Sequence, residues 1–222
     1  MSYSLNQRVG VFVDVQNMFY AAKHLYGSKL NFNRLLEYIA RERSVVRAIS
    51  YVVQTPDGDQ SNFFAMLRSN GYEVRAKELK LRPDGSAKGD WDMGLALDAL
   101  AMADRLDVVA IVSGDGDFVD LVTFLKARGV RVEVYSFAYS TSEELRYAAT
   151  EYYQMGPELV MNPSARPPFN GERFDNRGYD NRYENGERRP YPQRGYENRY
   201  EGLPEGEGMP ETDQELFTRE VQ

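Results

Sequence analysis

Residues 108–118 read VVAIVSGDGDF and combine an apolar run with a polar turn that carries two aspartates. The run is typical of a buried strand, because it is short, β-branched and uninterrupted by polar residues, and it predicts a strand over residues 108–113. The apolar spacing beyond the turn predicts a helix over residues 118–127 that stops at Gly129. The stretch therefore predicts a strand, a carboxylate-bearing turn and a helix in immediate succession.

The same alternation extends in both directions along the chain. Further strands are predicted for residues 9–15, 45–53, 72–79 and 130–137. Further helices are predicted for residues 32–41, 61–70, 91–102 and 142–149, and Gly71 is a natural C-cap for the second of these. Strands that alternate with helices form parallel sheets with helices on both faces. The expected fold is α/β, a Rossmann-like three-layer α/β/α architecture with a mostly parallel central sheet.

The composition changes near residue 162. Hydrophobic residues make up 42% of the chain, but Val, Ile and Leu almost vanish from residue 162 onward, where Arg, Asn, Gly, Glu, Tyr and Pro dominate. Such a segment cannot bury enough apolar surface to offset its conformational entropy. We therefore expect one folded domain over residues 1–161 and a disordered tail over residues 162–222.

Composition also excludes several classes of protein. The net charge of −7 argues against a protein that coats nucleic acid by bulk charge. The chain has no cysteine, which excludes disulfides and thiolate metal sites. The N-terminus lacks the apolar core of a signal peptide, and no apolar run approaches the roughly 18 residues of a membrane span. A cytoplasmic location is therefore expected.

Two kinds of catalytic site have little support. His24 is the only histidine, on a helix after the first strand, and we interpret it as a surface or packing residue. Serine-type catalysis is not expected, because no other imidazole could serve as the base. Gly114 and Gly116 fit neither a GxGxxG nor a P-loop pattern, so a nucleotide cofactor is not expected.

Aspartates gather instead at one edge of the predicted sheet. In open parallel α/β sheets the functional crevice lies beyond the carboxyl ends of the strands, where the strand order reverses. Asp14 ends the first strand in VFVDVQN, and Asp115 and Asp117 follow the fourth in SGDGDF. Asp92, in KGDWD, starts a helix at the same edge. If the first and fourth strands are neighbours, the four carboxylates meet.

A cation would relieve the repulsion between these carboxylates. Oxygen ligands without histidine or cysteine favour Mg²⁺ or Mn²⁺, which can activate water for attack on a phosphodiester. Taken singly, each aspartate can also be explained as a helix cap or a turn residue.

Three other polar residues belong to the same predicted edge: Asn17, Lys88 and Ser113. Asn17 and Ser113 are candidates for orienting ligands or water. Lys88 is a candidate for contact with a substrate phosphate, and a solvated loop lysine is an equal alternative.

Three ordered motifs resemble the NYN domain family in its LabA-like bacterial branch, which is part of the PIN-like nuclease superfamily. The motifs are VFVDVQNMF, KGDWDMGLALDAL, and IVSGDGDFVDLV followed by RGVRVEVYSF. The resemblance covers residues 8–160. It implies a metal centre made of Asp14, Asp92, Asp115 and Asp117, and it matches Asn17 to an asparagine of the family. It also implies a ribonuclease that takes single-stranded RNA and leaves 5′-phosphate and 3′-hydroxyl ends.

Asp98 matches a further acidic position of the family. It lies six residues after Asp92, roughly 240° around the helix, so the two carboxylates cannot both face one ion. We therefore expect Asp98 to contact the metal ligands without binding the ion itself, or to stabilise the fold. A rival interpretation is an RNA-binding regulatory protein that keeps the fold without turnover, since some relatives are regarded mainly as regulators. DNA or structured RNA is the alternative substrate.

The tail has its own pattern of charge. Residues 162–200 carry eight arginines among tyrosine and phenylalanine, and residues 201–222 are acidic. Arginine and aromatic side chains together can engage single-stranded RNA through phosphate pairing and base stacking. The tail is thus expected to contact RNA or a protein, and a spacer without a target is an equal alternative.

Overall fold

The computed structural model describes residues 6–54, 60–78 and 91–162. It also assigns the backbone of two short antiparallel strand pairs, β4 (Lys80–Leu81) with β5 (Ala87–Lys88) and β9 (Tyr183–Glu184) with β10 (Glu187–Arg188). The predicted disorder of the tail over residues 162–222 lies outside the described residues, apart from residue 162 and the strands β9 and β10.

A six-stranded sheet forms the centre of the domain, in the order β3-β2-β1-β6-β7-β8. Its strands are β1 (Arg8–Asp14), β2 (Ser44–Gln54), β3 (Glu73–Glu78), β6 (Val108–Val112), β7 (Arg131–Phe137) and β8 (Glu151–Met155). Every pairing is parallel. The mostly parallel sheet expected from the sequence is therefore confirmed, and within the described residues this sheet is parallel throughout.

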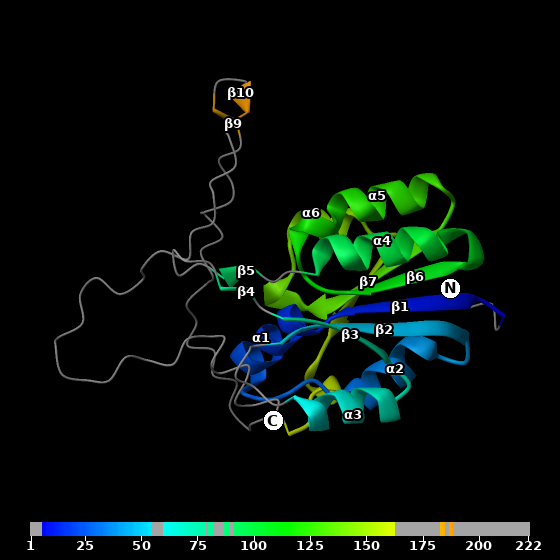
Figure 1. Ribbon diagram of the computed structural model, residues 1–222. Helices are drawn as coiled ribbons and strands as arrows, with labels where there is room; N and C mark the ends of the chain where they lie inside the picture. The colour runs from blue at the N-terminus through cyan, green and yellow to red at the C-terminus, as the bar shows by residue number, and fades with distance from the viewer. Residues whose placement is uncertain are drawn as a thin grey trace.

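In the part of the chain that the structure describes, six α-helices cover the two faces of this sheet (Figure 1). They are α1 (Val15–Tyr26), α2 (Phe32–Ala40), α3 (Ser61–Ser69), α4 (Asp92–Met102), α5 (Val119–Ala127) and α6 (Glu143–Ala148). The first three pack in one hydrophobic cluster and the last three in the other. The predicted three-layer α/β/α architecture is confirmed.

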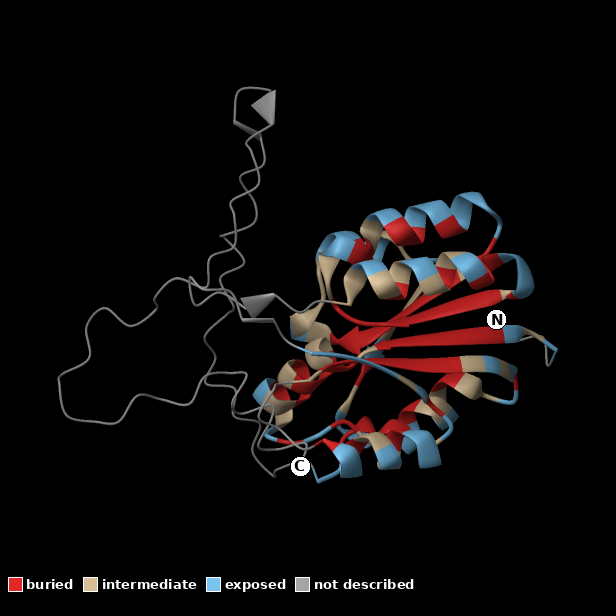
Figure 2. Ribbon diagram, viewed as in Figure 1, coloured by how far each residue is buried: buried red, intermediate tan, exposed pale blue. Residues whose placement is uncertain are grey.

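The strand alternation of β1 explains how both layers are held. Val11 and Val13 belong to the cluster under α1, α2 and α3, whereas Phe12 belongs to the cluster under α4, α5 and α6. All three side chains are fully buried. A strand buried on both faces is an apolar run without polar interruptions, which is the pattern of this segment (Figure 2).

The reversal of strand order falls between β1 and β6. The two strands pair in parallel from Val9 with Val108 to Val13 with Val112. Their carboxyl ends therefore stop side by side, at Asp14 and at Ser113. The neighbouring position expected for the first and fourth predicted strands is confirmed.

Helix ends follow the expected local rules. Gly71 and Gly129 adopt φ of 87° and 81°, a left-handed conformation that suits glycine after a helix. Asp14 caps α1, because its side chain accepts a hydrogen bond from the backbone N–H of Asn17. The sequence predicted that the strand extends to residue 15. In the structure the strand ends at Asp14, and residue 15 is the first residue of α1.

A buried ion pair lies on the α2 side of the sheet. Arg43 Nη1 contacts Glu133 Oε1 at 2.9 Å, and both side chains are fully buried. The Tyr135 hydroxyl donates a further hydrogen bond of 2.7 Å to Glu133. Burial alone would raise the pKa of Glu133, but the hydrogen bonds and charge of Arg43 outweigh it and hold that pKa below its ordinary value.

Strand β8 was not predicted from the sequence. Its residues EYYQM lie at the edge of the sheet and are mostly half-buried, so the segment lacks the apolar run that marks the inner strands. No helix among the described residues has the length and apolar character needed to cross a membrane.

Candidate metal centre

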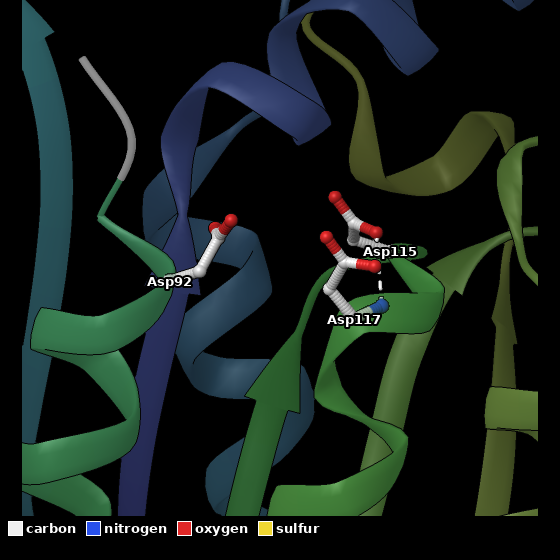
Figure 3. A group of neighbouring side chains, drawn as sticks. All are labelled: Asp92, Asp115 and Asp117. Atoms are coloured by element: carbon white, nitrogen blue, oxygen red, sulfur yellow. Dashed lines mark hydrogen bonds between the residues drawn. The ribbon is translucent and has the colours of Figure 1, made fainter. Parts of the chain in front are cut away.

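Three carboxylates meet at the carboxyl edge of the sheet. One oxygen from each of Asp92, Asp115 and Asp117 lies within 4.8 Å of the other two. Figure 3 shows Asp92 on one side, at the start of α4, and the other two facing it from the loop after β6. Oxygen ligands on opposite sides of a Mg²⁺ ion are about 4.2 Å apart, since each bond is about 2.1 Å long. Small side-chain rotations would therefore bring all three oxygens onto one cation.

The loop after β6 aims its two aspartates at the same side. Asp115 caps the 3-10 turn η2 (Gly116–Phe118), because its Oδ1 accepts a hydrogen bond of 3.1 Å from the Asp117 backbone N–H. The bond is drawn as a dashed line in Figure 3. Asp117 is exposed, and Asp115 is half-buried. Asp115 thus has the capping role that the sequence allowed, while Asp117 is not the cap.

Glycine is required in this loop by close packing. A Cβ at Gly114 would overlap the backbone carbonyl of Ser140. The Gly114 carbonyl in turn accepts a hydrogen bond of 2.9 Å from the Ser142 backbone N–H. The carboxylate loop is therefore fixed against the segment that follows β7.

Trp91 positions Asp92, which is the first residue of α4. Its indole N–H donates a hydrogen bond of 2.9 Å to the carbonyl of Val52 in β2. Its ring centroid lies 5.6 Å from that of Tyr51, and a Cβ at Gly94 would overlap the indole. This role of Trp91 was not predicted from the sequence, although Trp91 is the only tryptophan of the chain and directly precedes Asp92.

Asp14 lies beside the three carboxylates and is linked to them through Ser113. Ser113 Oγ donates a hydrogen bond of 3.2 Å to Asp14 Oδ2 and accepts one of 3.2 Å from the Asp115 backbone N–H. Asp14 Oδ1 accepts a bond of 3.1 Å from the Asn17 N–H. Asp14 is not one of the three residues whose oxygens lie within 4.8 Å of one another.

Burial raises the pKa of the Asp14 carboxyl from 3.8 to about 6, and the charge of Asp115 adds to this effect. The hydrogen bonds from Asn17 and Ser113 act in the opposite direction but do not compensate. A carboxylate that is destabilised by burial and by a neighbouring negative charge is relieved by a cation. The donor set and its electrostatics therefore fit a hard divalent ion.

The remaining predicted residues, Asn17, Asp98 and Lys88, have three different outcomes. Asn17 joins α1 to the carboxylate loop, because its side-chain oxygen accepts a hydrogen bond of 3.0 Å from the Gly114 N–H. Asp98 faces β2 and β3 instead: the Tyr51 hydroxyl donates to its Oδ2 at 2.9 Å, and Arg75 Nε lies 3.6 Å from the same oxygen. Lys88 belongs to β5, and its side chain lies outside the described residues.

Comparison with known proteins finds relatives that cover most of this chain. The chain is 31% identical over 172 residues to the "Low amplitude and bright protein LabA" of Synechococcus elongatus, which covers 73% of this chain and 92% of that protein. It also matches the solved structure of a protein of unknown function from Vibrio parahaemolyticus, with a TM-score of 0.66 and 36% identity, over 72% of this chain and 100% of that one.

The family expected from the three sequence motifs is also found. Residues 8–156 match the NYN domain, which includes all six strands of the sheet and the four aspartates. Proteins of this family are typically metal-dependent nucleases, and the cluster of three aspartates is present in this chain. The chain therefore belongs to the NYN domain family.

Proposed function

We propose that this protein is a metal-dependent ribonuclease that hydrolyses RNA phosphodiester bonds at the carboxyl edge of its sheet. The observation that carries the proposal is the approach of Asp92, Asp115 and Asp117 to within 4.8 Å of one another at the point where the strand order reverses. Three carboxylates from two separate segments would repel without a cation, and helix capping explains only Asp115.

In this proposal Asp92, Asp115 and Asp117 hold one Mg²⁺ or Mn²⁺ ion directly. Asp14 is the fourth carboxylate, and Ser113 links it by hydrogen bonds to the backbone of Asp115. A pKa of about 6 leaves most of the Asp14 carboxyl ionised at neutral pH, so it can take part as a ligand. Asn17 fixes the loop by its bond to Gly114.

A bound divalent ion would supply two effects, the polarisation of a phosphate oxygen and a lower pKa for an attacking water. The chain itself supplies the position. Two of the carboxylates come from a loop that is packed against the segment after β7, and the third comes from a helix anchored by Trp91. Such preorganisation matters because misplaced charges lose most of their effect in the transition state.

RNA is the proposed substrate, because proteins with this domain generally bind RNA. The expected products carry 5′-phosphate and 3′-hydroxyl ends, as the family resemblance implies. Lys88 is the proposed contact for a substrate phosphate. It is the last residue of β5 and precedes Asp92 by four positions.

The test is cleavage of end-labelled single-stranded RNA, with a DNA strand of the same sequence in parallel. Each would be incubated with the full chain in Mn²⁺, in Mg²⁺ and in chelator. We expect RNA cleavage only with a metal. Asp14→Asn and Asp115→Asn should each lower the rate at least about 100-fold, because a misplaced ion loses both water activation and charge stabilisation.

The matched control is Asp104→Asn. Asp104 follows the other end of α4, and its side chain is 80% exposed in an ion pair with Arg128. Surface pairs of this kind contribute little to stability, so this variant should cleave like the wild type. RNA that binds but stays intact in both metals would refute the proposal in favour of a regulatory RNA-binding protein. Preferred cleavage of the DNA strand would refute the choice of substrate.

A further inference from the structure

An exposed aromatic side chain lies at the same edge of the sheet as the carboxylates. Tyr139 belongs to the 3-10 turn η3 (Ala138–Ser140), which directly follows the last residue of β7. Its relative exposure is 68%, which is unusual for a large side chain of this domain. Within the described residues only Met93 and Tyr147 exceed it among the large hydrophobic side chains.

The backbone that carries Tyr139 is held firmly. The hydroxyls of Ser140 and Thr141 donate hydrogen bonds of 3.0 Å and 2.8 Å to the carbonyl of Phe137. The Ser140 carbonyl packs so closely on Gly114 that no side chain fits there. The residue next to Tyr139 therefore touches the residue next to Asp115.

The C-terminal end of α1 packs against the last residue of β7, two residues before Tyr139. The Tyr26 ring lies 5.5 Å from that of Phe137, between centroids. Burial raises the pKa of Tyr26, and the charges of Glu158 and Tyr139 add to this effect. Lys23 is one turn earlier on α1 and hence on a similar side of the helix as Tyr26.

These observations define an aromatic surface next to the candidate metal centre. A large aromatic ring exposed to water is unfavourable by itself, and a ring on a rigid segment pays little entropy on binding a flat partner. Bases of single-stranded RNA stack on such rings with little regard to sequence, because every base has a π face. In the interior of a duplex both faces of each base are already covered by its neighbours.

We propose that Tyr139 is a stacking platform for an unpaired base of an RNA strand whose phosphate lies at the Asp92, Asp115 and Asp117 centre. This inference rests on the proposed function for the position of that phosphate. It specifies the substrate class further: the strand must be single-stranded within one or two nucleotides of the bond that is cleaved. The platform recognises the presence of a base and not its identity.

Tyr147 provides a matched control. It is also a tyrosine, with an exposure of 82%, but it lies in the last turn of α6. The carbonyl of the next residue, Ala148, accepts a hydrogen bond from Lys126 near the end of α5. Helix α5 begins at the carboxyl edge and runs away from it, so Lys126 lies at its distant end. The contact with Lys126 therefore places Tyr147 away from the carboxylates.

The test measures binding separately from cleavage. Fluorescence anisotropy of a labelled ten-nucleotide single-stranded RNA would be recorded with the full chain in chelator. Tyr139→Ala should weaken binding about 10-fold, in line with the loss of one base stack. Tyr139→Trp and Tyr147→Ala should bind within about twofold of the wild type. Thermal melts of all variants would establish that each is folded.

A series of RNAs with one abasic nucleotide sharpens the test. For the wild type, one position of the abasic nucleotide should reproduce the weakening seen with Tyr139→Ala. On that RNA the substitution should have no further effect, because the stack is already absent. Binding of a blunt duplex of the same sequence should be insensitive to Tyr139→Ala.

Two results would overturn the stacking platform: Tyr139→Ala binding like the wild type, or Tyr147→Ala weakening binding to the same degree. The proposed function has a separate readout, the metal-dependent cleavage. Cleavage without any effect of Tyr139→Ala on binding would leave the ribonuclease standing and refute the platform. A binding defect specific to Tyr139 without cleavage would support the platform and refute the ribonuclease.

Discussion

The Ser113 hydroxyl donates a hydrogen bond of 3.2 Å to Asp14 and so joins the carboxyl ends of β1 and β6. Ser113 is fully buried, and its oxygen also accepts the backbone N–H of Asp115. One side chain therefore positions the carboxylate of Asp14 and the backbone of Asp115, which come from segments far apart in the sequence.

Ser113→Ala should weaken metal binding without removing a ligand. Loss of the hydroxyl leaves Asp14 less well oriented and the Asp115 N–H without this acceptor. Changes behind metal ligands typically cost about 10- to 100-fold in affinity, and we expect about 10-fold. The affinity would be measured by recording the melting temperature at increasing concentrations of Mn²⁺. Ser113→Thr, which keeps the hydroxyl, is the control for packing, and an unchanged Mn²⁺ affinity in Ser113→Ala would contradict the expectation.

Asp14 should make the metal-free protein less stable as the pH rises from about 4 to about 6. Its pKa is about 6 in the folded protein against 3.8 for the ordinary group, so the folded state binds the proton more tightly than the unfolded chain. The free energy of unfolding therefore falls across this window and is level above it. The full effect is on the order of 1–3 kcal/mol.

The substitution Asp14→Asn isolates this effect, because asparagine still caps α1. In chelator, urea unfolding should show the variant to be more stable than the wild type at pH 7, with the difference disappearing towards pH 4. Millimolar Mn²⁺ should reverse the order at pH 7, since only the wild type keeps the ligand. A difference that does not change between pH 4 and pH 7 would contradict the raised pKa of Asp14.

Asp117 should stabilise the protein only when metal is present. Asp117→Asn removes a repulsion on the order of 1 kcal/mol between partly solvated carboxylates, so in chelator it should melt at or above the wild type. Mg²⁺ or Mn²⁺ should raise the melting temperature of the wild type more than that of the variant. Asp117→Ala should behave in the same way, because Asp115 and not Asp117 caps η2. A penalty for alanine that is equal with and without metal would sink the assignment of Asp117 as a ligand.

Arg43 should be among the residues on which the stability of the domain depends most. Arg43→Met would leave the Glu133 carboxylate buried with its main charged partner removed, at a cost of about 3 kcal/mol in the free energy of unfolding. Adding Glu133→Gln should recover part of that loss, because the remaining group is neutral. Arg47→Met provides the comparison: its pair with Glu73 is half-exposed and should cost less than about 1 kcal/mol. Urea unfolding at pH 7 measures all three, and equal costs for Arg43→Met and Arg47→Met would contradict this ranking.

Removal of residues 162–222 should leave a folded domain, because the apolar pattern of the sequence ends near residue 160. The truncated protein should bind single-stranded RNA more weakly than the full chain at low salt, and the difference should shrink at high salt, since the arginines of the tail act through phosphates. Anisotropy at two salt concentrations measures this. Equal affinities at both would favour an inert spacer, and an insoluble product would show that the boundary is misplaced.

Local sequence patterns determined the inner strands, the helices and the chemistry of the edge. Apolar β-branched runs reveal a strand buried on both faces, whatever its neighbours are, and Gly71 and Gly129 mark helix ends because of their left-handed backbone. Asp14, Asp115 and Asp117 were placed at the sheet edge because they follow buried strands, and Asp92 because it starts a helix at that edge; the family resemblance grouped the four as a metal centre. These features depend on residues close together in the chain.

The tertiary structure alone decided what depends on contacts between distant segments. Strand β8 is a mixed polar and aromatic segment that becomes a strand by pairing with β7. The bond between Ser113 and Asp14, the anchoring of Trp91 on Val52 and the direction of Asp98 toward Tyr51 each join residues at least 39 positions apart. Periodicity along the chain records how deeply a residue is buried, but not which residue it meets. That choice follows from the order of the strands and the packing of helices across them.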